Sequence, residues 1–292
     1  MPAAVATALA ERLLPWYREH ARALPWRAPG FGAWGVLVSE FMLQQTPVAR
    51  VIPLLEAWLE RWPTPAALAD DAPAEAVRAW ANLGYPRRAL WLHRAATEIR
   101  DRHDGVVPRD VDALLALTGI GDYTARAVAA FAYGERHPVV DTNTRRVLAR
   151  AVAGVEHPAP PHRRDLDAMA ALLPEPPEDA ALMNAAMMEL GQVVCVARAP
   201  RCGACPLRDA CAWVAAGSPA TPDLRRRQAR YEGSDRQARG AVLRRLREAD
   251  GPVAARELLA DWPDAAQRDR AILSLLQDGL IETDGEHVRL PR

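Results

Sequence analysis

The chain of 292 residues contains no lysine, so all 37 of its basic residues are arginine. No side chain can therefore form a Schiff base, which excludes mechanisms that need a lysine nucleophile. The sequence also lacks an apolar run near the roughly twenty residues that a membrane-spanning helix needs. Its first twenty residues mix charged and apolar side chains, which is typical of an amphipathic helix rather than a signal peptide. We expect a soluble, cytosolic protein of about two domains that enters no membrane.

Cysteine is scarce too, and all four cysteines fall in one short stretch, as Cys195-x6-Cys202-x2-Cys205-x5-Cys211. Four thiolates in one loop can hold a metal centre, and the wider gaps let the chain wrap around a bulky cluster. The spacing predicts a [4Fe-4S] cluster, although tetrahedral zinc suits the same ligands. Two disulfides are disfavoured because nothing else in the sequence indicates secretion.

The formal net charge is zero, but the charges are unevenly distributed. Residues 195–247 carry 12 arginines and 4 acidic residues. Such a local excess is what a contact with a phosphate backbone would need. A solvated linker would show the same composition.

Helical patterns dominate the chain. Apolar residues recur at three- and four-residue spacing over 51–61 and 73–81, and no long alternating segment precedes the C-terminus, so most of the protein should be α-helical. Near the C-terminus, helices are predicted over 235–250, 254–262 and 265–279, followed by a hairpin over 280–290 that turns at Asp284-Gly285. This order is typical of a winged helix.

The first segment with chemical content is 33–46. On a helix, Glu40 has Val36 and Leu37 one turn before it and Leu43 one turn after it, so its carboxyl group should lie in an apolar face. Burial favours the protonated form, which can serve as a general acid near pH 7. A structural alternative is a glutamate at the helix edge that pairs with an arginine.

Two further segments carry candidate functional residues. Residues 111–134 predict a helix, a tight turn and a second helix, in which Gly119 and Gly121 allow positive φ and close approach. The N–H groups before the second helix could then hold a DNA phosphate without reading its base. Asp141 follows a short extended run and precedes a helical one, so it either caps that helix or faces positive charge that develops on a substrate.

Six segments occur in order: SEFMLQQT, LGYPRRALWLH, LTGIGDYTARAV, VVDTNTRRVLAR, MNAAMMELG and the four-cysteine loop. Together, over about residues 10–217, they resemble the MutY-type adenine DNA glycosylases of the endonuclease III superfamily. The resemblance implies an all-α helix-hairpin-helix DNA glycosylase. Its parts would be a six-helix barrel over 28–140, an iron-sulfur cluster domain from 1–27 plus 141–217, a basic linker over 218–234 and a winged-helix-like domain over 235–292.

The resemblance also implies catalytic roles. Glu40 looks like the acid that protonates the adenine ring, and Asp141 resembles the carboxylate that stabilises the oxocarbenium-like sugar. Tyr123 and Asn143 resemble polar residues that position the sugar and Asp141. Bifunctional relatives place a lysine where this chain has Tyr123, so the resemblance implies hydrolysis of the glycosidic bond without cleavage of the strand.

The same resemblance extends to DNA and cofactor binding. Gln45 and Tyr85 match residues that enter the base stack, and Gly119 and Gly121 match the hairpin that holds the DNA backbone. The expected ligands of a [4Fe-4S] cluster are Cys195, Cys202, Cys205 and Cys211.

One departure concerns lesion reading. Most members carry a larger C-terminal domain that reads 8-oxoguanine, whereas only about sixty residues follow the linker here. The implied function is base excision repair, with release of adenine mispaired with 8-oxoguanine or guanine in double-stranded DNA. We expect a monomer in the cytoplasm, associated with the nucleoid. The alternative is a catalytically silent, metal-stabilised DNA-binding regulator, which would have no need of Glu40 in an apolar face.

Overall fold

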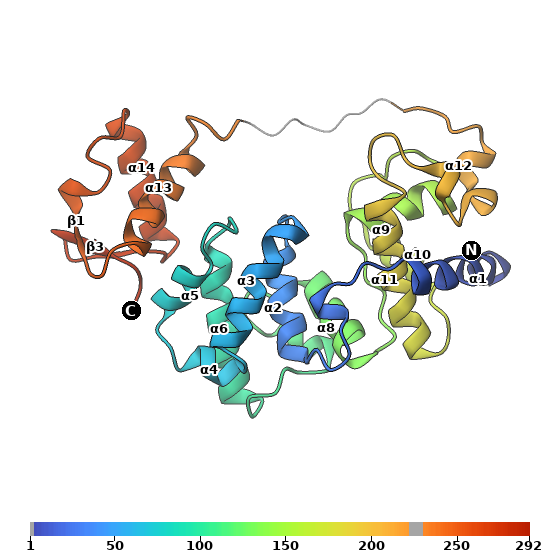
Figure 1. Ribbon diagram of the computed structural model, residues 1–292, viewed down its shortest axis with the longest axis horizontal. Helices are drawn as coiled ribbons and strands as arrows, with labels where there is room; N and C mark the ends of the chain where they lie inside the picture. Colours follow the sequence, from blue (N-terminus) through green and yellow to red (C-terminus); the bar gives the residue numbers. More distant parts are fainter. Residues whose placement is uncertain (1–2, 222–229) are drawn as a thin grey trace. The chain divides into compact units, whose positions relative to one another are not determined.

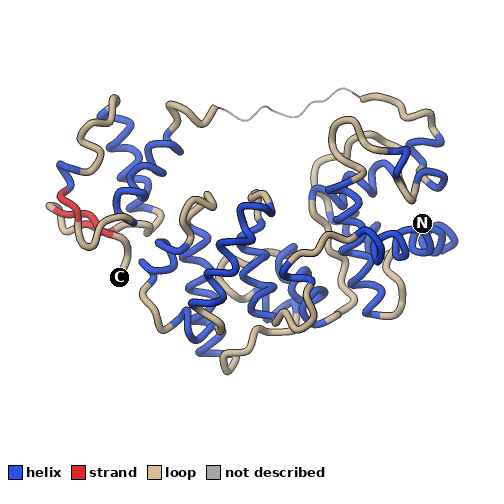
Figure 2. Tube along the Cα trace, viewed as in Figure 1, coloured by secondary structure: helices blue, strands red, loops and turns tan. Residues whose placement is uncertain are grey.

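A computed structural model describes residues 3–221 and 230–292, and helices form most of them (Figures 1 and 2). The helices are α1 (Ala3–His20), α2 (Ala33–Leu43), α3 (Val48–Arg61), α4 (Pro65–Ala69), α5 (Pro73–Ala79), α6 (Arg87–Arg102), α7 (Val111–Leu115), α8 (Asp122–Tyr133), α9 (Thr142–Val147), α10 (Arg163–Ala170), α11 (Pro177–Val193), α12 (Ala212–Ala215), α13 (Asp235–Arg247) and α14 (Ala265–Gln277). Short 3-10 turns are η1 (Pro25–Arg27), η3 (Cys202–Ala204), η4 (Arg208–Ala210) and η5 (Ala255–Glu257), and η2 (Leu148–Val152) is π-helical. In these described ranges, no helix has the length and apolar character to cross a membrane. The expectation of an all-α fold is confirmed.

The chain divides into two compact units. The first comprises residues 1–36, 109–115 and 120–225, and the second comprises 37–108, 116–119 and 226–292. Each unit is therefore assembled from segments that are distant in sequence. The domain boundaries implied by the family resemblance stay a prediction.

The core of the first unit joins α1 to α11 and to the cysteine loop. Leu9 and Leu13 of α1 are buried with Met183 and Leu190 of α11 and with Trp213 of α12. The apolar positions of α1 thus face a core while its charged residues stay outside, as expected of an amphipathic helix. The core thereby joins the two ends of the unit's sequence.

Aromatic side chains fill the core of the second unit. Trp58, Trp62 and Trp80 are almost fully buried, and the ring of Trp58 makes edge contacts with the other two, at centroid distances of 4.6 and 5.8 Å. Such edge-to-face pairs add to the stabilisation that comes from burying apolar surface. These side chains hold α3 and α5 together, and α6 adds its buried Leu92.

The predicted helix-turn-helix over 111–134 is confirmed as α7, a turn and α8. Gly119 has φ +80°, and a Cβ there would lie 2.7 Å from Cβ of Trp91, so this position requires glycine for two reasons. Gly121 differs from expectation, because its φ is −98° and the space around it is open. Thr118 ties the turn to α6, since its N–H and hydroxyl donate to the carboxylate of Glu98 at 2.7 and 2.8 Å.

The C-terminal residues form a small module whose element order agrees with the predicted winged helix. Three short antiparallel strands, β1 (Val253–Ala254), β2 (Glu282–Thr283) and β3 (His287–Arg289), pair in the order β1-β3-β2. Gly285, at φ +99°, lies in the predicted turn between β2 and β3. The helix predicted over 254–262 is wrong, because β1 pairs with β3 and only η5 follows it.

Candidate active site and cysteine pocket

Glu40 lies within α2 and is only 7% exposed. Val36 and Leu37, one turn before it, are also buried. The sequence therefore correctly predicted a carboxyl group on an apolar helix face. A buried carboxyl group meets the main requirement for a general acid. The catalytic role of Glu40 stays a prediction.

Asp141 is the N-cap of α9. One carboxylate oxygen, Oδ1, accepts a hydrogen bond from the Thr144 N–H at 2.7 Å, and Oδ2 accepts one from Asn143 Nδ2 at 2.7 Å. The capping interpretation is thus confirmed, whereas the role of Asn143 in positioning a sugar stays a prediction. The cap does not compete with a catalytic role, because a carboxylate has several acceptor positions and the side chain remains partly exposed.

Hydrogen bonds connect Asp141 to the cysteine loop. Arg146 Nη2 donates to Asn143 Oδ1 at 2.9 Å and to the Gly191 carbonyl at 2.5 Å, and Arg146 Nε donates to the Cys195 carbonyl at 2.7 Å. Asn143 in turn donates to Asp141. The Arg146 side chain therefore both helps to orient the Asp141 carboxylate and holds the cysteine loop at Cys195. Sequence reasoning assigned Arg146 no role, and the only signal was the basic pair that follows Asp-Thr-Asn-Thr.

A second residue that the sequence analysis missed is Asn184 of α11, which is fully buried. Its Oδ1 accepts from the Val139 N–H at 2.9 Å, and its Nδ2 donates to the His137 carbonyl at 2.9 Å. These bonds fix the extended segment that leads to Asp141. Tyr123 of α8 packs against the small apolar cluster that contains Val139, so the first unit brings Tyr123 close to this segment.

Gln45 and Tyr85 lie together in the second unit. The Tyr85 hydroxyl donates to Gln45 Oε1 at 2.7 Å, and 53% of Tyr85 is exposed. Both residues have left-handed backbones, with φ of 56° and 46°, a conformation that is costly for side chains other than glycine. Two such residues side by side on a surface indicate a functional constraint.

Glu40 belongs to the second unit, while Asp141, Asn143 and Tyr123 belong to the first. The pairing of the two carboxyl groups across one substrate stays a prediction.

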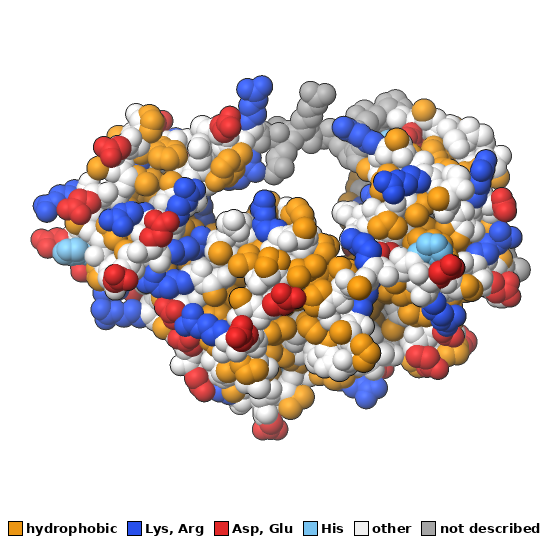
Figure 3. All heavy atoms as spheres, viewed as in Figure 1, with side chains coloured by type: hydrophobic (Ala, Val, Ile, Leu, Met, Phe, Trp, Pro, Cys, Tyr) orange, Lys and Arg blue, Asp and Glu red, His pale blue; other side chains and the backbone are white. Residues whose placement is uncertain are grey.

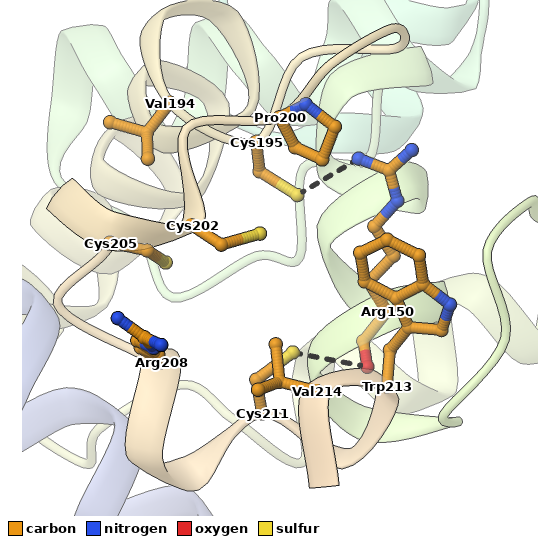
Figure 4. Close-up of a pocket in the computed structure, with 10 residues that line it drawn as sticks. All are labelled: Arg150, Val194, Cys195, Pro200, Cys202, Cys205, Arg208, Cys211, Trp213 and Val214. Carbon is orange, nitrogen blue, oxygen red and sulfur yellow. Dashed lines mark hydrogen bonds between the residues drawn. The ribbon is translucent and has the colours of Figure 1, made fainter. Parts of the chain in front are cut away.

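The four cysteines line one pocket of about 300 Å³, part of which is open solvent (Figure 4). Their side chains point toward the same space from the loop between α11 and α12. Arg150 closes one side of it, where its guanidinium donates to Cys195 Sγ at 3.6 Å and lies 5.0 Å from the ring centroid of Trp213. Across residues 3–221 and 230–292, no three Cys, His, Asp or Glu side chains are close enough to bind one metal ion.

Burial disfavours deprotonation of two of these thiols. It raises the pKa of Cys205 to about 11, and it raises the pKa of Cys195 in spite of the nearby Arg150. Metal binding would therefore have to release protons from the loop. The pocket thus offers several soft donors in a partly dry setting.

Three arginines of the basic stretch are exposed in the cysteine loop. Arg198, Arg201 and Arg208 all lie on the surface of the cysteine loop, which suits the predicted phosphate contact. Elsewhere on the visible face, acidic and basic side chains are interspersed (Figure 3). Part of the predicted basic linker, 222–229, lies outside the described residues.

Residues 38–166 match the family model of the HhH-GPD superfamily base excision DNA repair proteins. The chain is 59% identical to an adenine DNA glycosylase of Mycolicibacterium smegmatis over 92% of this chain and 91% of that protein. It is 54% identical to an adenine DNA glycosylase of Mycobacterium tuberculosis over 92% of this chain and 88% of that protein. Among solved structures, that of a thermostable thymine-DNA glycosylase aligns with a TM-score of 0.66 at 23% identity, over 73% of this chain and 97% of the other.

The chain therefore contains, over residues 38–166, a domain of the HhH-GPD superfamily of base excision DNA repair proteins. Within that superfamily it belongs to the adenine DNA glycosylase family. The match to the mycobacterial relatives covers about nine tenths of each of them, so these relatives are close to this chain in length.

Proposed function

We propose that the protein is a monofunctional adenine DNA glycosylase of base excision repair. It hydrolyses the N-glycosidic bond of adenine that is mispaired with 8-oxoguanine or guanine in duplex DNA. The observation that carries this proposal is Glu40, a carboxyl group that is 7% exposed within an apolar helix face. Membership in the adenine DNA glycosylase family supports it independently.

In the proposed reaction, Glu40 donates a proton to a ring nitrogen of the extruded adenine. Protonation makes the base a better leaving group, and positive charge develops on the sugar as the bond breaks. A buried carboxyl group suits this step because burial disfavours its charged form.

Asp141 faces the positive charge on the sugar. Both of its oxygens accept N–H hydrogen bonds, which orient the group before the substrate binds. Asn143 holds one of these bonds, and Tyr123 lines the site from α8. Water completes the hydrolysis, since the chain has no lysine that could form a Schiff base and cut the strand.

DNA binding in this proposal uses three sets of residues. Gln45 and Tyr85 enter the base stack and fill the space that the extruded adenine leaves. The turn at Gly119 and the start of α8, which has no side-chain cap, offer N–H groups to a backbone phosphate. The exposed arginines of the cysteine loop add contacts to DNA phosphates, and these contacts do not depend on the base sequence.

We propose that Cys195, Cys202, Cys205 and Cys211 hold a [4Fe-4S] cluster. The donor set fits, because four cysteine sulfur atoms line one pocket and the Arg150 guanidinium donates to one of them. Each thiolate would bind a different iron of the cluster, so three side chains need not meet at one ion. When bound, the cluster would cross-link the loop and so hold its arginines in place for DNA. The loop would also brace Arg146, which reaches Asp141 through Asn143, while the Thr144 N–H orients Asp141 independently of the loop.

A single-turnover assay tests the activity. The wild type should release adenine from duplexes in which it faces 8-oxoguanine or guanine, and not from a matched duplex in which it faces thymine. Glu40→Gln should slow release about 10²- to 10⁴-fold and leave duplex affinity unchanged, because the variant keeps the shape and loses the proton. Tight binding without any release by the wild type would favour the DNA-binding regulator. Strand cleavage before alkali treatment would contradict the monofunctional assignment.

We also propose that the enzyme works as a monomer in the cytoplasm, where it is bound to the nucleoid. Light scattering of the free protein should give the mass of one chain, 32.0 kDa. With duplex DNA added, it should give the mass of one chain bound to one duplex. A dimer mass in either sample would contradict the monomer.

A further inference from the structure

Arg88 is a buried cation in the second unit. It is 3% exposed, and burial lowers the pKa of its guanidinium to about 10. Its Nη1 donates to the carbonyls of Phe41 and Gln44, each at 2.7 Å, and its Nη2 donates to the carbonyl of Gly84 at 3.2 Å. These acceptors are backbone oxygens, so the side chain joins backbone segments instead of pairing with an acid.

The two segments that Arg88 joins are those that carry Gln45 and Tyr85. Phe41 and Gln44 lie at the end of α2, where carbonyl groups lack partners within the helix, and Gly84 immediately precedes Tyr85. One planar guanidinium therefore holds both segments in a fixed relative position.

Further contacts join the same segments. The Arg88 guanidinium lies 5.3 Å from the ring centroid of Tyr85 and 5.4 Å from that of Trp80. The hydroxyl of Thr46 lies 3.2 Å from the carbonyl oxygens of both Gln44 and Leu83. The aromatic contacts are of the cation–π type, which gains strength when the cation is desolvated.

These contacts stabilise the unfavourable left-handed backbones of Gln45 and Tyr85. Such conformations persist only where the surrounding structure enforces them, and they cluster at functional sites. Arg88 and Thr46 lie directly behind both residues, and the direct bond between Tyr85 and Gln45 closes the group.

We propose that Arg88 is the positioning residue that holds Gln45 and Tyr85 as one preformed wedge, and that this wedge determines how well the enzyme unstacks the bases at a mispair. This inference rests on the proposed function. Arg88 does not contact the DNA and acts only through Gln45 and Tyr85. A lysine could not replace it, because a single ammonium cannot reach the carbonyls on both segments with the fixed geometry of a guanidinium.

The test uses Arg88→Lys and Arg88→Met in the full chain. The matched control is Arg102→Met, which removes the same charge from an exposed position on the same helix, roughly 20 Å further along it. Duplexes carry 2-aminopurine beside the base that faces adenine, because the fluorescence of this analogue rises when its neighbours unstack. The excision rate in single turnover and the dissociation constants for mispaired and matched duplex are measured on the same samples.

We expect both Arg88 variants to lose most of the fluorescence rise on binding. Their preference for mispaired over matched duplex should fall about tenfold, the size of effect that release of one strained residue can produce. Arg102→Met should behave as the wild type. A wild-type fluorescence rise with wild-type preference in Arg88→Lys would overturn the proposal.

If neither Arg88 variant folds, Thr46→Val carries the test, since it removes a hydroxyl that bridges the two segments from behind the two surface residues. The fluorescence rise should then be reduced, and an unchanged rise would overturn the proposal. Failure of the proposed function has a different signature, namely absence of adenine release by the wild type. The unstacking signal needs no bond cleavage, so the two outcomes are distinguishable.

Discussion

Gly191→Ala should damage the site although it replaces neither Glu40 nor Asp141. A Cβ at Gly191 would lie 2.8 Å from Cβ and the carbonyl oxygen of Asn143 and 2.9 Å from its carbonyl carbon. These distances are roughly 0.6 Å inside the 3.4 Å at which ordinary van der Waals contact begins. Two of the three atoms are backbone, so α9 itself must move away from α11.

The consequences follow from what Asn143 holds. Its displacement would loosen both the bond to Asp141 and the bond from Arg146. Overpacking of this kind typically costs about 1–3 kcal/mol of stability. Because a misplacement of about 1 Å can cost roughly a hundredfold in rate, we expect adenine release to slow about tenfold to a hundredfold.

Single-turnover excision, duplex affinity and thermal unfolding would be measured together on Gly191→Ala. The control is Gly32→Ala, because Gly32 lies in the same unit, needs no positive φ and has open space around it. It should match the wild type in all three measurements. A Gly191→Ala protein with the wild-type excision rate would refute the argument that close approach of α9 and α11 sets the position of Asp141.

Three other predictions concern single side chains. Asp141→Asn should stop excision while duplex binding persists, and normal turnover would reduce Asp141 to a helix cap. Cys205→Ser should lose the cluster and weaken duplex affinity more than the rate of excision, and metal analysis of the wild type should find four irons per chain, whereas one zinc would overturn the cofactor assignment. Burial alone would raise the pKa of Glu189, but hydrogen bonds from two arginines hold it below its usual value. Its folded pKa is thus depressed, so the stability it contributes is present at neutral pH and is lost as the pH falls below about 4.5. Glu189→Gln should cost roughly 3 kcal/mol at pH 7 in denaturant unfolding, since it leaves partly buried arginines without their charge partner, and should flatten this acid dependence.

Local patterns in the sequence predicted the features that depend on near neighbours. The apolar positions around Glu40 indicated its burial, and the order of residues around Asp141 indicated a cap, because both depend on a single helix. The spacing of the cysteines likewise indicated one shared pocket. In each case the residues concerned lie within a few turns of one another.

Features that depend on distant segments were not predicted. Arg88 hydrogen-bonds to the end of α2, and Asn184 hydrogen-bonds to the extended segment before Asp141. Because both partners are distant in sequence, neither residue has a local signal. The false helix over 254–262 has the same origin, since helix-favouring residues there yield to pairing of β1 with β3. Gly121 shows the converse, a glycine in a turn whose backbone does not need one.

One core contains Leu9 and Leu13 together with Leu190 and Trp213. During synthesis on the ribosome, this core can therefore form only after the last of these residues has been made. Because α1 is made well before the cysteine loop, the surface that buries it is completed only about two hundred residues later. Until then its apolar side chains stay accessible to chaperones and to other nascent chains. The unit closes when its last segment arrives, and a polypeptide that stops short of the cysteine loop leaves its beginning uncovered.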